Sequence, residues 1–109
     1  MRIVFLPETL VYFNRLADIL YEQGYFSFKD SSLKYVDDLL EDIRLHLHSK
    51  VKKPAPGYFE KYGHNLLYAV FPKNNTTFWY IFFNIYRQNG ELVYLIRYVS
   101  NNHVIAQYL

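Results

Sequence analysis

The sequence of 109 residues has no cysteine and contains only four glycines, four prolines and one methionine. Without cysteine, the chain forms no disulfide bonds and offers no thiolate to a metal ion. Nothing in the sequence suggests an internal repeat or a low-complexity segment. A chain of this length is typical of one domain with one hydrophobic core, so we expect residues 1–109 to form a single domain.

Long hydrophobic runs are also missing. The segment MRIVFLPETL meets Pro7 and Glu8 before it reaches the length of a signal-peptide core. No stretch approaches the roughly 20 apolar residues of a membrane-spanning helix. We therefore expect a soluble protein that lies in the cytoplasm and does not contact a membrane.

Net charge is small, at +2, but it is unevenly distributed. Residues 1–50 carry six basic and eight acidic groups, a net charge of −2, whereas residues 51–109 carry six basic and two acidic groups, a net charge of +4. A basic second half could bind a polyanion. Ordinary solvated surface charge explains the same numbers equally well.

Aromatic residues are abundant, at 20%, with 12 tyrosines, nine phenylalanines and one tryptophan. Tyrosine buries a ring while keeping a polar tip, so it suits half-buried surfaces and interfaces. Eight of these rings lie in the stretch TTFWYIFFNIYRQNGELVYLIRY, residues 76–98. The question is whether this stretch is only core or also presents a surface to a partner.

Two helices are predicted after a short N-terminal strand over residues 1–6. Pro7 suits the first turn of a helix, and Gly24 is a natural stop. In this first helix the apolar residues at helical spacing are Leu10, Phe13, Ala17 and Leu20. The second helix is expected to run to about residue 50, with Asp30, Ser31 and Ser32 as candidate N-caps and a stripe formed by Leu33, Val36, Leu40, Ile43 and Leu47.

The rest of the chain is typical of β-structure. The segment VKKPAPGY, residues 51–58, predicts a loop with little regular structure. Strands are expected at 66–71, 78–86 and 92–99, and Asn89-Gly90 favours a type I′ hairpin. The predicted fold is therefore α+β, in the order β-α-α-β-β-β. In it, the N-terminal strand joins an antiparallel meander and the two-helix hairpin packs on one face.

A two-residue loop at Asn89-Gly90 would place Asn84 opposite Leu95 and Phe82 opposite Arg97. Strand alternation then defines a face for the helices, formed by Ile81, Phe83, Ile85, Tyr94, Ile96 and Tyr98. The other face carries Tyr80, Phe82, Asn84, Tyr86, Val93, Leu95, Arg97 and Val99. An apolar face left bare usually marks a partner or a groove. The alternative is that the C-terminal segment, residues 103–109, folds over it.

This order of elements, with the segments KPAPGYFEKYG, LLYAVF, WYIFFNIY and ELVYLIRYVSNNHVIAQYL, resembles the RelE/ParE toxin superfamily of bacterial type II toxin–antitoxin systems. The similarity is to a subgroup described as plasmid stabilisation proteins. It implies a toxin that a cognate antitoxin neutralises. The RelE branch cleaves mRNA in the ribosomal A site without a metal, whereas the ParE branch poisons DNA gyrase and is not a nuclease.

Cleavage of RNA by its own 2′-hydroxyl needs a base, an acid and cations around the phosphate. The resemblance implies that His103 and Tyr108 supply the acid–base chemistry. Arg97 is the candidate phosphate ligand, and the candidate substrate-binding residues are Lys52, Lys53, Tyr80, Phe82 and Tyr86. We expect neither a cofactor nor a metal ion.

Each candidate also has a plainer interpretation. Arg97 would instead pair with an acid or lie over an aromatic ring, Lys52 and Lys53 would be loop charges, and His103 would cap a turn. Three hypotheses follow: a metal-independent endoribonuclease, a non-enzymatic toxin that binds gyrase or another protein, and a non-toxic or degenerate α+β binding module. The small number of basic residues favours the second and third. A homodimer is compatible with each.

Overall fold

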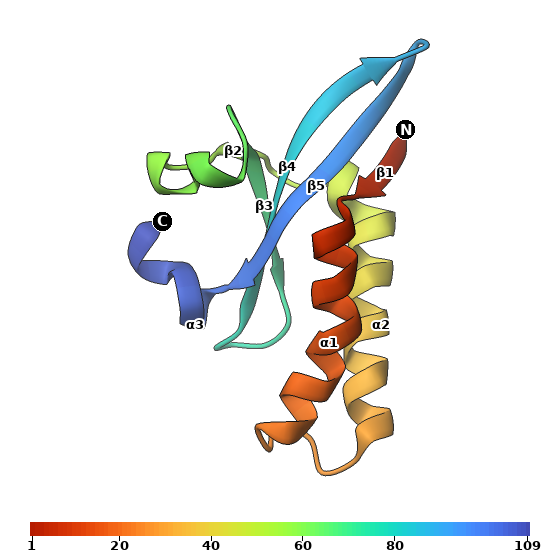
Figure 1. The fold of residues 1–109 in the computed structure, drawn as a ribbon, viewed down its shortest axis with the longest axis vertical. Helices are drawn as coiled ribbons and strands as arrows, with labels where there is room; N and C mark the ends of the chain where they lie inside the picture. The colour runs from red at the N-terminus through yellow and green to blue at the C-terminus, as the bar shows by residue number, and fades with distance from the viewer.

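The computed structural model describes all residues 1–109 as an α+β arrangement of helices and one sheet (Figure 1). The strands are β1 (Arg2–Phe5), β2 (Lys53–Pro54), β3 (Leu67–Pro72), β4 (Phe78–Gln88) and β5 (Glu91–Asn101). The α-helices are α1 (Pro7–Glu22), α2 (Lys29–His46) and α3 (Asn102–Ile105). The 3₁₀ helices are η1 (Leu47–Ser49), η2 (Gly57–Tyr62) and η3 (Ala106–Tyr108).

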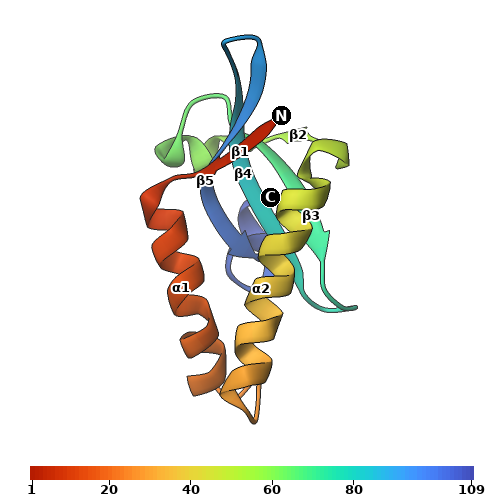
Figure 2. The same cartoon turned by 90° about the vertical axis from the view of Figure 1, so that its right-hand side faces the viewer.

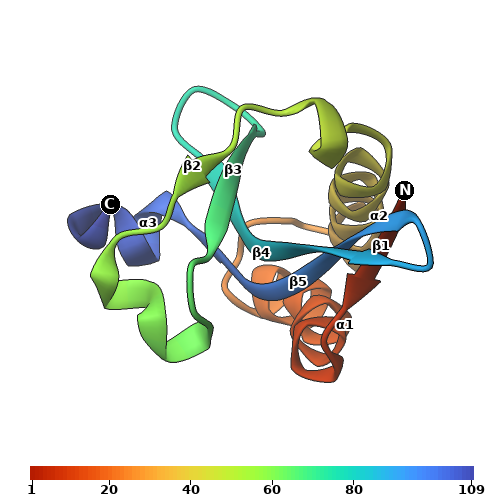
Figure 3. The ribbon, with the colours of Figure 1, turned by 90° about the horizontal axis from the view of Figure 1, so that it is seen from above.

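The five strands form one sheet in the order β1-β5-β4-β3-β2. β1 runs parallel to β5, and the other neighbours are antiparallel. The helices α1 and α2 lie side by side on one face of this sheet (Figures 2 and 3). The predicted α+β class is confirmed. None of the helices has the length and apolar character needed to cross a lipid bilayer.

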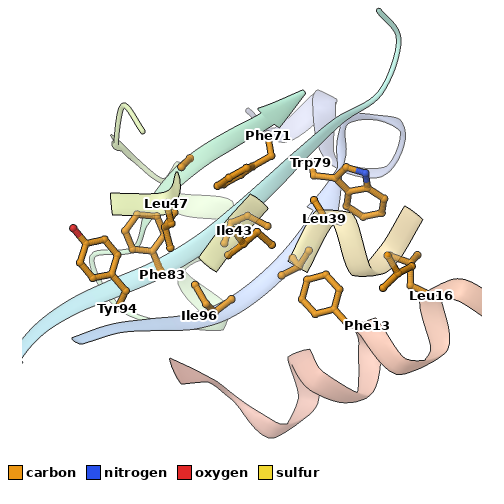
Figure 4. Close-up of a cluster of buried hydrophobic side chains, with 14 of the residues drawn as sticks. Phe13, Leu16, Leu39, Ile43, Leu47, Phe71, Trp79, Phe83, Tyr94 and Ile96 are labelled. Atoms are coloured by element: carbon orange, nitrogen blue, oxygen red, sulfur yellow. The ribbon is translucent and has the colours of Figure 1, made fainter. Parts of the chain in front are cut away.

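The main core lies between the sheet and the two long helices (Figure 4). Phe13 and Leu39 from the helices pack with sheet residues that include Ile81 and Phe83. The predicted helical stripes are partly wrong, because Leu10 and Leu33 are exposed, while Leu16 and Leu39 are buried. Spacing alone does not decide between adjacent apolar residues such as Leu39 and Leu40, since they lie only about 100° apart around a helix.

The predicted N-caps of α2 are also wrong. α2 begins at Lys29 with Phe28 at the cap position, and no side chain caps it. Ser32 is fully buried within the helix, and its hydroxyl donates to the backbone carbonyl of Ala17 in α1. A residue that suits a helix end therefore serves as a contact between helices, which sequence cannot reveal because it depends on the packing of α1 against α2.

The hairpin between β4 and β5 has the predicted turn but not the predicted register throughout. Asn89 and Gly90 both have positive φ, at 53° and 78°, and Asn84 lies opposite Leu95 as expected. The predicted pairing of Phe82 with Arg97 is wrong. Phe83 pairs with Ile96 and Phe82 with Tyr98, so a β-bulge leaves Arg97 as an extra residue in β5.

The bulge reverses the alternation of the last part of β5. Val99 joins the main core under the helices, although alternation had placed it on the open face. Tyr98 moves the other way and packs with Phe82 and Phe59. An inserted residue shifts every following side chain to the opposite face, because strand side chains alternate with a period of two.

The second face of the sheet is covered, so its expected open aromatic surface is largely absent. The predicted loop contains β2, and the adjoining η2 lies on the side of the sheet opposite α1 and α2, as does the C-terminal segment (Figure 1). Phe59 of η2 and Ile105 of α3 form a second cluster with Phe82, which is fully buried. Phe82 therefore cannot stack on a substrate, and the alternative in which the tail covers this face is correct for its central part.

The main core predicts a clear contrast within α2. Ile43 is fully buried, so Ile43→Ala should lower the free energy of unfolding by about 2–5 kcal/mol. Leu45 of the same helix is 54% exposed, so Leu45→Ala should change it by no more than about 0.5 kcal/mol. Urea denaturation followed by circular dichroism measures both. Equal effects of the two substitutions would contradict the packing of α2.

Candidate functional site

Arg97 occupies the β-bulge and is held by two side chains of the neighbouring strand. Its Nε donates to Asn84 Oδ1 at 2.5 Å, and its Nη2 donates to the Tyr86 hydroxyl at 3.0 Å. The Asn84 amide in turn donates to the backbone carbonyl of His64 at 3.0 Å. We call these four residues the Arg97 site. Both polar contacts of the guanidinium are to neutral groups.

Arg97 forms no ion pair with a carboxylate and lies over no aromatic ring. Both plainer interpretations of this residue are therefore wrong. No carboxylate neutralises the guanidinium, and its hydrogen bonds to Asn84 and Tyr86 restrain its orientation. A restrained, unpaired arginine is suited to bind a carboxylate or phosphate through its remaining N–H groups.

A cavity of about 500 Å³ lies beside Arg97. It lies between the first turns of α1 and the second half of β5, with η2 at its edge. Its lining residues are Leu6, Glu8, Thr9, Tyr12, Lys61, Tyr62, Arg97, Tyr98 and Val99. Two cations and several rings thus line one concave surface, while Glu8 adds a single acidic group.

The backbone of Gly63 packs closely against the side chain of Arg97. A Cβ atom at this position would lie only 2.7 Å from Arg97 Cδ and 3.2 Å from its Nε. Real Cβ atoms do not approach other atoms so closely, so any other residue would push the arginine side chain aside. Glycine is therefore required here for a close approach, and it helps to set the direction of the guanidinium.

The predicted acid and base lie elsewhere. His103 is in the first turn of α3, where its ring Nε2 lies 3.2 Å from Thr77 Oγ1 and its backbone N–H donates to Asn101 Oδ1. His103 lines a separate cavity of about 500 Å³, which lies between the helical hairpin and the C-terminal end of β5. Tyr108 stacks on Tyr58, with 3.6 Å between ring centroids. Neither His103 nor Tyr108 lines the cavity beside Arg97.

The predicted substrate-binding residues are also dispersed. Lys52 turns toward the helical layer, where its Nζ donates to the carbonyl of His48 at 2.8 Å. Lys53 is exposed on β2, and Tyr80 packs near Tyr68 on the second face. Of the predicted residues, the structure brings only Tyr86 into contact with Arg97.

Two residues near the site were missed by the sequence reasoning. His64 is exposed, and its Nδ1 contacts Glu60 Oε1 in a hydrogen-bonded pair. The backbone carbonyl of His64 is the group that accepts from Asn84. Helical spacing gives no signal for this pair, because η2 ends at Tyr62 and His64 lies beyond Gly63, whose backbone is extended.

The tyrosines around η2 have altered acidity. A hydrogen bond with Lys61 lowers the pKa of Tyr58, whose ring lies 3.9 Å from Lys61 Nζ. The rings of Tyr62 and Tyr98 are stacked, with 3.8 Å between their centroids. Burial, together with a hydrogen bond to Tyr98, raises the pKa of Tyr62 to about 12. Tyr62 therefore stays protonated at neutral pH and is not a general base there.

No group of three or more His, Cys, Asp and Glu side chains is placed to hold a metal ion.

Comparisons of this chain with protein-family models, with curated proteins and with solved structures found no match.

Substitution of Gly63 tests the close approach behind Arg97. Gly63→Ala should displace the Arg97 side chain, shift its Nε–H resonance in NMR spectra and destabilise the fold by about 1–3 kcal/mol. Gly57→Ala is the matched control, because a Cβ there has no neighbour within 4 Å. An unchanged Arg97 resonance in Gly63→Ala would show that the glycine does not position the arginine.

Tyr12 lines both large cavities, and burial raises its pKa to about 12 from an ordinary value of 10. The unfolded chain then loses this proton first as the pH rises. Stability should be unaffected by this group below pH 10 and should fall between about pH 10 and 12, by about 1–2 kcal/mol after allowance for partial exposure. Denaturation across this range, wild type against Tyr12→Phe, measures the difference, with the exposed Tyr21→Phe as control. Parallel curves for wild type and Tyr12→Phe would contradict this.

Proposed function

We propose that this chain is the toxin of a type II toxin–antitoxin module of the RelE/ParE kind. On this proposal it acts in the cytoplasm, inhibits growth by binding a macromolecular target through the Arg97 site, and is neutralised by a cognate antitoxin. The observation that supports it most directly is the unpaired guanidinium of Arg97, restrained by Asn84 and Tyr86 beside a cavity of about 500 Å³.

The arrangement favours target binding over RNA cleavage. Arg97 and Lys61 are the only basic side chains that line the cavity, which is few for a surface that grips a polynucleotide. The acid and base that the resemblance implied, His103 and Tyr108, do not line this cavity. A protein target such as DNA gyrase needs only one well-placed anion for Arg97 and an apolar surface against Tyr62 and Tyr98.

A second candidate, a metal-independent endoribonuclease, is favoured by one observation. His64 and Glu60 form a pair of the kind in which a carboxylate orients an imidazole, and Asn84 joins the backbone of His64 to Arg97. In this version the target phosphate lies between Arg97 and the exposed His64 ring, outside the cavity, which His64 does not line. His64 takes the proton of the ribose 2′-hydroxyl, whose oxygen bonds to the adjacent phosphorus. The bond from phosphorus to the 5′ oxygen breaks, and that oxygen takes a proton from water. Arg97 stabilises the charge on the phosphorane.

Induced expression in a bacterial host tests both candidates. Wild-type protein should arrest growth, and Arg97→Ala should abolish the arrest because the binding charge is lost. Arg87→Ala is the matched control, since Arg87 lies on the neighbouring strand β4 and contacts only the carbonyl of Gly90. Soluble levels of each variant are compared, so that loss of folding is not mistaken for loss of activity.

The accompanying readouts separate the two mechanisms. DNA-damage (SOS) induction with intact mRNA supports gyrase binding. Cleaved mRNA that persists in His103→Ala but disappears in His64→Ala supports the nuclease. Wild-type protein that leaves growth unchanged would contradict the toxin proposal and favour a non-toxic binding module.

A further inference from the structure

The outer edge of β3 is only partly paired. β2 contributes just Lys53 and Pro54, which lie opposite Tyr68 and Leu67. Beyond this pair, Val70 and Pro72 of β3 have no strand opposite them on this side. The sheet therefore ends here in a short open edge.

The backbone of Val70 points toward this open edge. The N–H of Ala55 donates to the carbonyl of Leu66 at 2.8 Å, so Leu66 directs its polar groups away from β4. Alternate residues of a strand share this direction, which places the N–H and C=O of Val70 on the same side. An extended segment laid along the edge would meet both groups.

A groove of about 440 Å³ follows this edge, which we call the β3-edge groove. Its lining residues are Lys50, Val51, Lys53, Tyr68, Val70 and Pro72. Val51 is 77% exposed, the largest exposure among the bulky apolar residues of the chain. The groove therefore combines a backbone pairing edge with aliphatic surface, which suits the alternating side chains of an extended peptide.

Charge around the groove is of one sign. Lys50 and Lys53 line it, and neither forms an ion pair. Lys52 and Lys73 adjoin the groove in the sequence, but the first turns toward the helical layer and the second lies over the Tyr35 ring. The only acids after residue 50 are Glu60, which contacts His64, and Glu91, which lies near the N-terminal amine. No carboxylate of the chain neutralises these lysines.

We propose that the β3-edge groove binds an acidic extended segment of another protein chain. The segment pairs its backbone with Val70 as an added strand and places its carboxylates against Lys50 and Lys53. The lining has three aliphatic residues, a single ring at Tyr68 and no arginine, which favours a peptide over a single-stranded nucleic acid, because the latter is bound by several stacking rings and phosphate contacts. This site is separate from the Arg97 site, which contributes no residue to it.

The test uses a synthetic peptide in which valine and glutamate alternate. Its matched control has the same sequence with N-methyl groups on alternate residues, which removes backbone donors but keeps every charge. In an NMR titration of the full chain, the unmethylated peptide should shift the Val70 amide saturably and bind at least about tenfold more tightly than the control.

Two variants and one competitor complete the test. The double substitution of Lys50→Glu and Lys53→Glu should weaken peptide binding about tenfold or more, whereas Lys29→Glu with Lys34→Glu, the same charge change on α2, should leave it nearly unchanged. Equal binding of both peptides would reduce the effect to simple charge attraction and overturn strand addition. Absence of binding would also overturn the proposal. It would indicate instead that the lysines prevent other chains from pairing with this edge.

Displacement of the peptide by a single-stranded RNA that binds the same lysines more tightly would assign the groove to nucleic acid instead. Each of these outcomes leaves the growth experiment on Arg97 unaffected, so failure here is distinguishable from failure of the toxin proposal.

Discussion

The single extra residue in β5 organises both faces of this sheet. Because Arg97 bulges out between the pairs Phe83–Ile96 and Phe82–Tyr98, the side chains on either side of it belong to different layers. Ile96 and Val99 pack under the helices, and Tyr98 packs with Phe82 on the other face. A regular β5 would have placed Tyr98 in the main core and Val99 on the outer face, and neither cluster would have its present composition.

The bulge also explains why a charged residue lies near the centre of an aromatic sheet. A bulge commonly redirects a side chain, and here Asn84 and Tyr86 fix the redirected guanidinium from the adjacent strand. Gly63 leaves just enough space for its aliphatic part. The direction of the Arg97 side chain thus depends on the bulge in β5, on the close approach of Gly63 after η2, and on the two hydrogen bonds that Arg97 donates to side chains of β4. No one of these alone would restrain it.

The sequence predicted what depends on local chemistry and missed what depends on packing. Asn89-Gly90 specified the turn, because positive φ suits these residues, and alternation near the turn was correct through Asn84. The bulge has no local signal in ELVYLIRYV, since every residue there also fits a regular strand. The prediction of the candidate site was wrong for the same reason, because it assumed a regular β5. Arg97 and Tyr86 are together, but Phe82 became core, and His64 was overlooked because its link to Asn84 spans 20 residues.

The uneven charge of the sequence becomes a division between layers. The acidic first half forms β1 and the two long helices, whereas the basic second half forms the rest of the sheet with η2 and the C-terminal segment. Arg97 and the β3-edge lysines therefore belong to, or adjoin, the basic half, near opposite edges of one sheet whose order is β1-β5-β4-β3-β2. An anionic partner is favoured on the sheet side and disfavoured on the helical side. Because the net excess is only +4 in that half, this charge orients a partner but supplies little affinity. Tight binding at either surface must then come from specific contacts, such as the restrained guanidinium at one edge and the unpaired backbone of Val70 at the other.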